Sequence, residues 1–134
     1  AATAQGMRAV NHICGKKDAI RMEIMPAAVF TNPEVAGVGL TSDQCDSMGI
    51  EYNTHKGFYR SNGKALAMDE SEGMVKLITD KDNKIIGCHA YGAHAADLIQ
   101  EATAIMNFNG TTENLVDIIH THPTLEEILH DAAL

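Results

Sequence analysis

The segment that most restricts the fold of this chain runs from residue 73 to residue 92, with the sequence GMVKLITDKDNKIIGCHAYG. Two runs of mainly apolar and β-branched residues flank a polar stretch, Asp80 to Asn83, which has the composition of a turn. This pattern predicts two strands that pair as an antiparallel hairpin. We therefore expect a fold built around an antiparallel sheet.

The strongest helical pattern follows this hairpin directly. Apolar residues at helical spacing form one continuous stripe on a helix of about four turns, and Asn109-Gly110 ends it. The stripe consists of Ala95, Leu98, Ile99, Ala102, Ile105 and Met106. A short helical stretch is expected at residues 115 to 119. A terminal helix is predicted by four apolar residues that share one face: Leu125, Ile128, Leu129 and Ala132.

The first half of the chain mixes short extended segments with short helices. Residues 24 to 41 predict two extended segments around Asn32-Pro33, because a residue before proline is disfavoured in the helical region. Thr41 and Gln44 form a capping-box pattern that starts a short helix. Residues 51 to 60 predict a partly exposed strand, and residues 2 to 14 predict the end of a helix. Grouped strands with helices before and after them indicate an α+β fold, an antiparallel sheet with helices packed on it.

Composition limits the classes of partner. The chain has 134 residues, of which 45% are hydrophobic, which fits one compact core, and its net charge of −8 offers no basic surface for nucleic acid. No apolar run approaches the roughly 20 residues that span a bilayer, so we expect no membrane partner and a cytoplasmic protein. The three cysteines, Cys14, Cys45 and Cys88, form no CxxC pair and are expected to be reduced thiols.

Residues 120 to 127, HTHPTLEE, carry the densest set of chemically active side chains. The chain reverses direction at Pro123, so the imidazole of His122 and the carboxylate of Glu127 can meet where the terminal helix begins. A carboxylate bonded to one ring nitrogen fixes the tautomer and leaves the other nitrogen free to accept a proton. This is the arrangement of a catalytic dyad.

Two other interpretations of the same residues remain open. Thr124 and Glu127 match S/T-x-x-E, a capping box in which the threonine hydroxyl caps the first turn and the glutamate binds the backbone N–H of the cap. On spacing alone this structural interpretation is favoured. His120 and His122 offer two metal ligands, but no third is identifiable.

Three strings occur in an order and at separations that resemble a known family. They are PAAVFTNPEVAGVGLT (26–41), KIIGCHAYGAHAADLIQEATAIM (84–106) and HTHPTLEE (120–127). Together they resemble the C-terminal dimerisation, or interface, domain of the pyridine nucleotide-disulfide oxidoreductases. Within that family, TNPEVAGVG and H-x-HPTL-x-E resemble dihydrolipoamide dehydrogenase more than glutathione reductase. The ending HDAAL, without a cysteine pair, disfavours mercuric reductase.

The resemblance implies a role for each matching position. His122 is expected to accept the proton of a dihydrolipoyl thiol, and Glu127 to orient His122. Pro123 is expected to hold the backbone of His122 close to the flavin, often through a cis peptide bond. In this family these residues complete the disulfide and FAD site of the partner subunit, so the resemblance implies a homodimer that uses FAD and NAD and acts on dihydrolipoamide or a lipoyl-bearing protein.

The chain lacks the rest of such an enzyme. It has no GxGxxG after a first strand and no redox cysteine pair. We interpret residues 1–15 as the terminal helix of a preceding FAD domain and residues 16–134 as the interface domain. The chain alone is expected to bind no cofactor and to be inactive, although the full-length protein would be an NAD-dependent oxidoreductase. The alternatives are a free-standing dimerisation or binding module without redox activity and, more remotely, a metal-binding protein.

Overall fold

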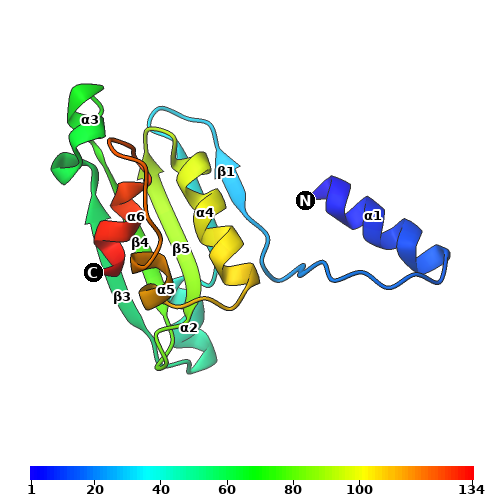
Figure 1. Ribbon diagram of the computed structural model, residues 1–134. Coiled ribbons are helices and arrows are strands. Elements are labelled where there is room, and N and C mark those ends of the chain that lie inside the picture. Colours follow the sequence, from blue (N-terminus) through cyan, green and yellow to red (C-terminus); the bar gives the residue numbers. More distant parts are fainter.

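The computed structural model describes residues 1–134 and shows an α+β fold (Figure 1). At its centre is a five-stranded antiparallel sheet in the order β1-β2-β5-β4-β3. The strands are β1 (Ala27–Val29), β2 (Val35–Gly39), β3 (Asn53–Phe58), β4 (Gly73–Thr79) and β5 (Ile85–Gly92). The predicted fold class and the predicted β4–β5 hairpin are both confirmed.

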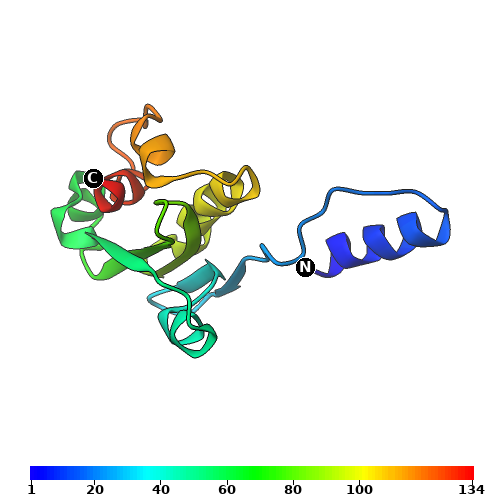
Figure 2. The ribbon, with the colours of Figure 1, turned by 90° about the horizontal axis from the view of Figure 1, so that it is seen from below.

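Two of the six helices cover one face of this sheet. The helices are α1 (Ala2–Ile13), α2 (Ser42–Met48), α3 (Gly63–Ala67), α4 (Ala95–Asn107), α5 (Thr112–Val116) and α6 (Glu127–Ala133). Helix α4 packs over β5 and β2, α6 packs over β3 and β4, and α5 contacts α6 (Figures 1 and 2). None of the helices is long and apolar enough to cross a membrane.

The core lies between the sheet and the helices α4, α5 and α6. Alternate residues of β4 and β5 point into it, as the period of two of a strand requires. These strand residues are Val75, Leu77, Cys88 and Ala90, and the helices add Leu98, Ile99, Ile128 and Leu129. The predicted apolar stripe of α4 is therefore its buried face.

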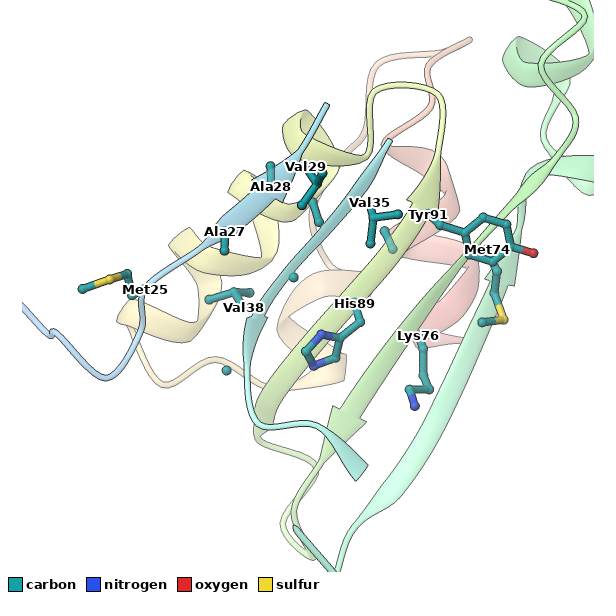
Figure 3. A pocket seen from close by; sticks show the side chains of 14 residues that line it. Met25, Ala27, Ala28, Val29, Val35, Val38, Met74, Lys76, His89 and Tyr91 are labelled. Atoms are coloured by element: carbon teal, nitrogen blue, oxygen red, sulfur yellow. The ribbon is translucent and has the colours of Figure 1, made fainter. Parts of the chain in front are cut away.

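The opposite face of the sheet is open. The strand register aligns five apolar side chains in one row across all strands: Phe58, Met74, Tyr91, Val35 and Val29. All of them except Phe58 line a shallow groove of about 580 Å³, into which Lys76 and His89 also project (Figure 3). Val29 is 60% exposed and Val35 is 49% exposed. The sheet thus presents an apolar row to solvent.

Helix α1 lies away from the rest of the structure (Figures 1 and 2). It buries none of its residues, and an extended segment leads from it back to β1. Arg8 pairs with Asp18 at 3.1 Å within this N-terminal part. Arg21 joins the segment to the core, because its Nη1 donates to the carbonyl oxygens of Met106 and Asn107 at the end of α4, each at 3.2 Å.

Two parts of the expected secondary structure were wrong or missing. Helix α5 is formed by Thr112–Val116, not by residues 115 to 119, because Thr111 caps it and forms a capping box with Asn114. The 3₁₀ turn at Tyr59–Ser61 and helix α3 were not anticipated. Helix α3 has only five residues and starts at Asn62, whose side chain accepts from the N–H of Ala65.

Candidate functional site

The loop between α5 and α6 carries the candidate site. It leaves α5, runs toward the end of the sheet where α3 lies, and returns into α6 (Figure 1). Asn62 holds the returning part of this loop, because its Nδ2 donates to the carbonyl oxygen of Thr124 at 3.0 Å while its Oδ1 caps α3. Asn62 is only 4% exposed, so this contact is well shielded from water.

His122 and Glu127 meet, as their spacing predicted. Nδ1 of His122 lies 2.9 Å from Oε2 of Glu127. The His122 side chain is 79% exposed and the Glu127 side chain 26%. Nε2 of His122 has no hydrogen bond within the chain, and the His122–Pro123 peptide bond is cis. The ring is therefore oriented on one side and accessible on the other.

Glu127 also binds the backbone of its own loop. The N–H of Thr124 donates to Oε1 of Glu127 at 2.7 Å, which is one half of the predicted capping box. The other half is wrong: the Thr124 hydroxyl donates to the carbonyl oxygen of Thr121 at 2.7 Å instead of capping the first turn. The catalytic and capping interpretations are therefore not exclusive, because each uses a different oxygen of one carboxylate.

These two hydrogen bonds favour the ionised form of Glu127. The bond to His122 contributes most, followed by the bond from the Thr124 N–H, and together they hold the pKa of Glu127 below its usual value of 4.5. The carboxylate is therefore ionised at neutral pH. An ionised partner at Nδ1 stabilises the imidazolium that forms when Nε2 accepts a proton.

His120 points in a different direction from His122. Its side chain is 8% exposed, and its Nε2 lies 2.9 Å from Oε1 of Glu101 on α4. Its Nδ1 lies 2.9 Å from the carbonyl oxygen of Ile118. Each histidine of the pair thus has its own glutamate partner, and no group of three histidine, cysteine or acidic side chains is arranged to hold a metal ion.

The cysteines and the other histidines lie outside this loop. All three cysteines are unpaired, and Cys45 and Cys88 are buried. Burial raises the pKa of both buried thiols. His55, His89 and His94 have their own partners in Thr79, the carbonyl oxygen of Leu40 and Asp97, respectively.

Two residues of the site were missed at the level of sequence. Asn62 lies far from the loop along the chain, in a stretch for which no structure was expected. Glu101 lies on α4, three residues after Leu98 and four before Ile105, beside the apolar stripe. A carboxylate at that spacing lies at the border of the buried face of α4. It was the available indication that a polar group contacts the helix there.

The matches to known proteins agree with this fold. The profile of the family described as pyridine nucleotide-disulphide oxidoreductase, dimerisation domain, matches residues 25–133. The chain belongs to this family of dimerisation domains. The expected resemblance is thereby confirmed.

Within the family, the similar proteins include dihydrolipoyl dehydrogenases. That of Synechocystis sp. is 39% identical over 98% of this chain and 29% of its own length. Mitochondrial dihydrolipoyl dehydrogenase 2 of Arabidopsis thaliana is 37% identical over 99% of this chain and 26% of its own length. The chain therefore spans less than a third of these relatives.

Solved structures show the same architecture. LpdA from Mycobacterium tuberculosis superimposes with a TM-score of 0.88 at 26% identity, over 97% of this chain and 29% of that protein. The flavoprotein disulfide reductase RclA from Escherichia coli gives a TM-score of 0.84 at 23% identity, over 93% of this chain and 29% of its own. The second likeness concerns the fold alone.

Proposed function

We propose that this chain is the C-terminal interface domain of a dihydrolipoamide-dehydrogenase-like flavoprotein disulfide oxidoreductase. In this proposal the His122–Glu127 pair is the general base for the disulfide and flavin site of the partner subunit. The observation that carries it is the 2.9 Å contact from Nδ1 of His122 to Glu127, with Nε2 exposed and unpaired. An oriented ring with one accessible nitrogen is positioned to accept a proton from an incoming substrate.

The chemistry requires such a base. A free thiol has a pKa of about 8.5 and is mostly protonated at neutral pH, whereas only the thiolate attacks a disulfide. Nε2 of His122 would accept the proton from the dihydrolipoyl thiol as the sulfur attacks. The resulting imidazolium would donate its Nδ1–H to Glu127, whose charge stabilises it.

FAD and NAD are proposed as cofactors of the longer protein. FAD would supply the electron acceptor beside the redox disulfide. The exposed side chains of His122 and Pro123 fit one wall of such a site, because they project from the loop with no covering element. This chain offers only open grooves in place of a deep enclosure, so the remaining walls would come from elsewhere.

The organisation of the longer protein follows from the same proposal. Residues 1–15 would belong to the preceding FAD domain, supported by the absence of buried residues in α1 and by a family match that starts at residue 25. Residues 16–134 would form the interface of a homodimer. The unpaired cysteines support a reducing compartment such as the cytoplasm.

The test is a comparison of the two half-reactions in the full-length enzyme carrying His122→Gln. Stopped-flow measurement should show a loss of about 10²- to 10⁴-fold in reduction by dihydrolipoamide, with electron transfer between flavin and NAD preserved. His94→Gln, which changes an exposed histidine at the start of α4, is the matched control. Equal loss in both half-reactions, or none in either, would refute the proposal.

The upstream coding sequence separates this proposal from a free-standing binding module. A reading frame that continues upstream through two nucleotide-binding domains and a redox cysteine pair supports the enzyme. A start codon just before residue 1 supports the module.

A further inference from the structure

His120 joins the site loop to helix α4 through contacts that the proposed base does not use. Its ring nitrogens face the carbonyl oxygen of Ile118 and a carboxylate oxygen of Glu101, each at 2.9 Å. The ring is nearly buried, with 8% of the side chain exposed, and Glu101 is 21% exposed. The contact therefore lies at the edge of the core and not in bulk water.

Both partners of His120 are acceptors only. A carbonyl oxygen has no proton to donate, and neither has an ionised carboxylate. A neutral imidazole carries one N–H, so it can satisfy one of these partners but not both. Both contacts are hydrogen bonds only when the ring carries two protons.

We propose that His120 is a positioning residue whose contacts with Glu101 and with the carbonyl oxygen of Ile118 fix the loop that carries His122. The inference rests on the proposed function only in naming what the loop positions. His120 precedes His122 by two residues, and Asn62 holds Thr124 two residues after it. The proposed base thus lies between two fixed points, one on α4 and one at the start of α3.

The charges around His120 come from two helices. Glu101 on α4 favours the charged ring. From α6, the ring of His130 packs edge-on with its centroid 5.4 Å from that of His120, and Asp131 lies 3.8 Å from His130. Glu127, at the start of α6, also senses the charge of His120, which contributes to its lowered pKa. Glu101 and Glu127 thus favour the imidazolium, while a protonated His130 would oppose it.

Loss of one ring proton should release one of these two contacts. When His120 loses a proton, one of its two bonds is lost and an acceptor in a poorly solvated place remains unsatisfied. We expect the loop to become more mobile on the α5 side while the contact between Asn62 and Thr124 persists. The base would then be held from one side only.

Nitrogen-15 NMR of the histidine rings tests the protonation state in the 134-residue chain. One nitrogen of His120 should change to the unprotonated signature at a lower pH in Glu101→Gln than in the unaltered chain, because the amide oxygen accepts a bond but carries no charge. Asp97→Asn is the matched control, since it removes the carboxylate partner of His94 from the same helix. The same ring signatures in Glu101→Gln and in the unaltered chain at every pH would overturn the proposal.

Amide hydrogen exchange tests the positioning role. Exchange at Ile118, whose N–H donates to the carbonyl oxygen of Leu115, should accelerate about tenfold in Glu101→Gln and stay unchanged in Asp97→Asn. His120→Gln should retain slow exchange better than His120→Asn. The longer Gln side chain can place its amide nitrogen at the position from which Nε2 of His120 contacts Glu101. Equal exchange in all variants would refute the positioning role. Neither measurement involves thiol oxidation, so this inference can fail while the proposed base survives, and the reverse.

Discussion

The two carboxylate oxygens of Glu127 have different partners. One fixes the tautomer of His122, and the other holds the turn on which His122 lies. Oε2 lies 2.9 Å from the ring nitrogen Nδ1 of His122, and Oε1 accepts a hydrogen bond from the N–H of Thr124 at 2.7 Å. Since the same carboxylate sets the ring and the backbone, neither can shift without the other. The spacing of the two residues predicted their meeting but not this division between oxygens.

Glu127→Gln should reverse the tautomer of His122 while the loop stays folded. The amide oxygen can still accept from Thr124, which places the amide NH₂ against Nδ1 of His122. Nδ1 must then act as acceptor, so the proton of the neutral ring moves to Nε2 and blocks it as a base. Nitrogen-15 NMR of the neutral ring shows directly which of the two ring nitrogens carries the proton. Glu126→Gln, which alters the neighbouring side chain, should leave the Nδ1–H tautomer in place, and an unchanged tautomer in Glu127→Gln would contradict the prediction.

The stability of the chain should depend on Glu127 below about pH 4.5. Hydrogen bonds to His122 and Thr124 lower the pKa of Glu127 in the folded state from its usual 4.5. A lowered folded-state pKa means that the stabilisation is complete above the unfolded pKa and is lost as the pH falls through the folded pKa. Urea unfolding between about pH 6 and pH 3 should therefore show a shallower acid loss in Glu127→Gln than in the unaltered chain. Parallel curves would contradict this, and Glu51→Gln provides an exposed control.

Gly57→Ala should weaken the contact between β3 and α6. A β-carbon at Gly57 would lie 2.3 Å from the carbonyl oxygen of Ile128 and 2.9 Å from its Cγ2, so the helix must move. Overpacking of this kind costs about 1–3 kcal/mol in the free energy of unfolding. Gly63→Ala is the control, since nothing lies within 4 Å of the added atom. Urea unfolding should show the loss at Gly57 alone.

The chain should self-associate through a surface that includes the site loop. A base that serves the partner subunit has to lie at the subunit contact, and Ile119, three residues before it, is 98% exposed. Ile119→Lys should therefore lower association more than Val35→Lys on the open sheet face. Sedimentation at high micromolar concentration measures both. A monomeric unaltered chain would count against a homodimer formed by this domain alone.

The 134-residue chain should be colourless and without dehydrogenase activity. Its grooves are open, and a flavin requires a preformed site that encloses it. An absorbance spectrum after incubation with FAD and dialysis gives the answer. Retained flavin absorbance would show that the chain builds more of the site than proposed.

Local patterns were sufficient to predict most of the fold. The β4–β5 hairpin, the two strands around Asn32-Pro33 and the helix capped by Thr41 all follow from neighbours in sequence, and the structure confirms each. Helix α5 was displaced because Ile118 and Ile119 look helical, although the capping box at Thr111 begins the helix earlier. A capping residue decided the boundary where hydrophobicity did not.

The site was predicted only as far as its contacts are local. His122 and Glu127 are five residues apart, so their spacing was informative. Asn62 and Glu101 reach the loop from other elements, and the spacing of Glu101 indicates a polar neighbour without indicating which residue it is. The Thr124 hydroxyl had two acceptable partners within its own turn, and the tight reversal at residues 121 to 124 favours the carbonyl oxygen of Thr121.

The order of the strands also predicts the order in which the parts of the sheet form during folding. The β4–β5 hairpin and α4 are contiguous in sequence, whereas β2 reaches β5 only by closing a long stretch of chain that brings Val35 beside Tyr91. Loop closure of that kind slows folding, so the hairpin and α4 should form the nucleus. Leu77→Ala in β4 should then slow folding, while Val38→Ala in β2 should mainly accelerate unfolding, as a chevron plot of each variant would show.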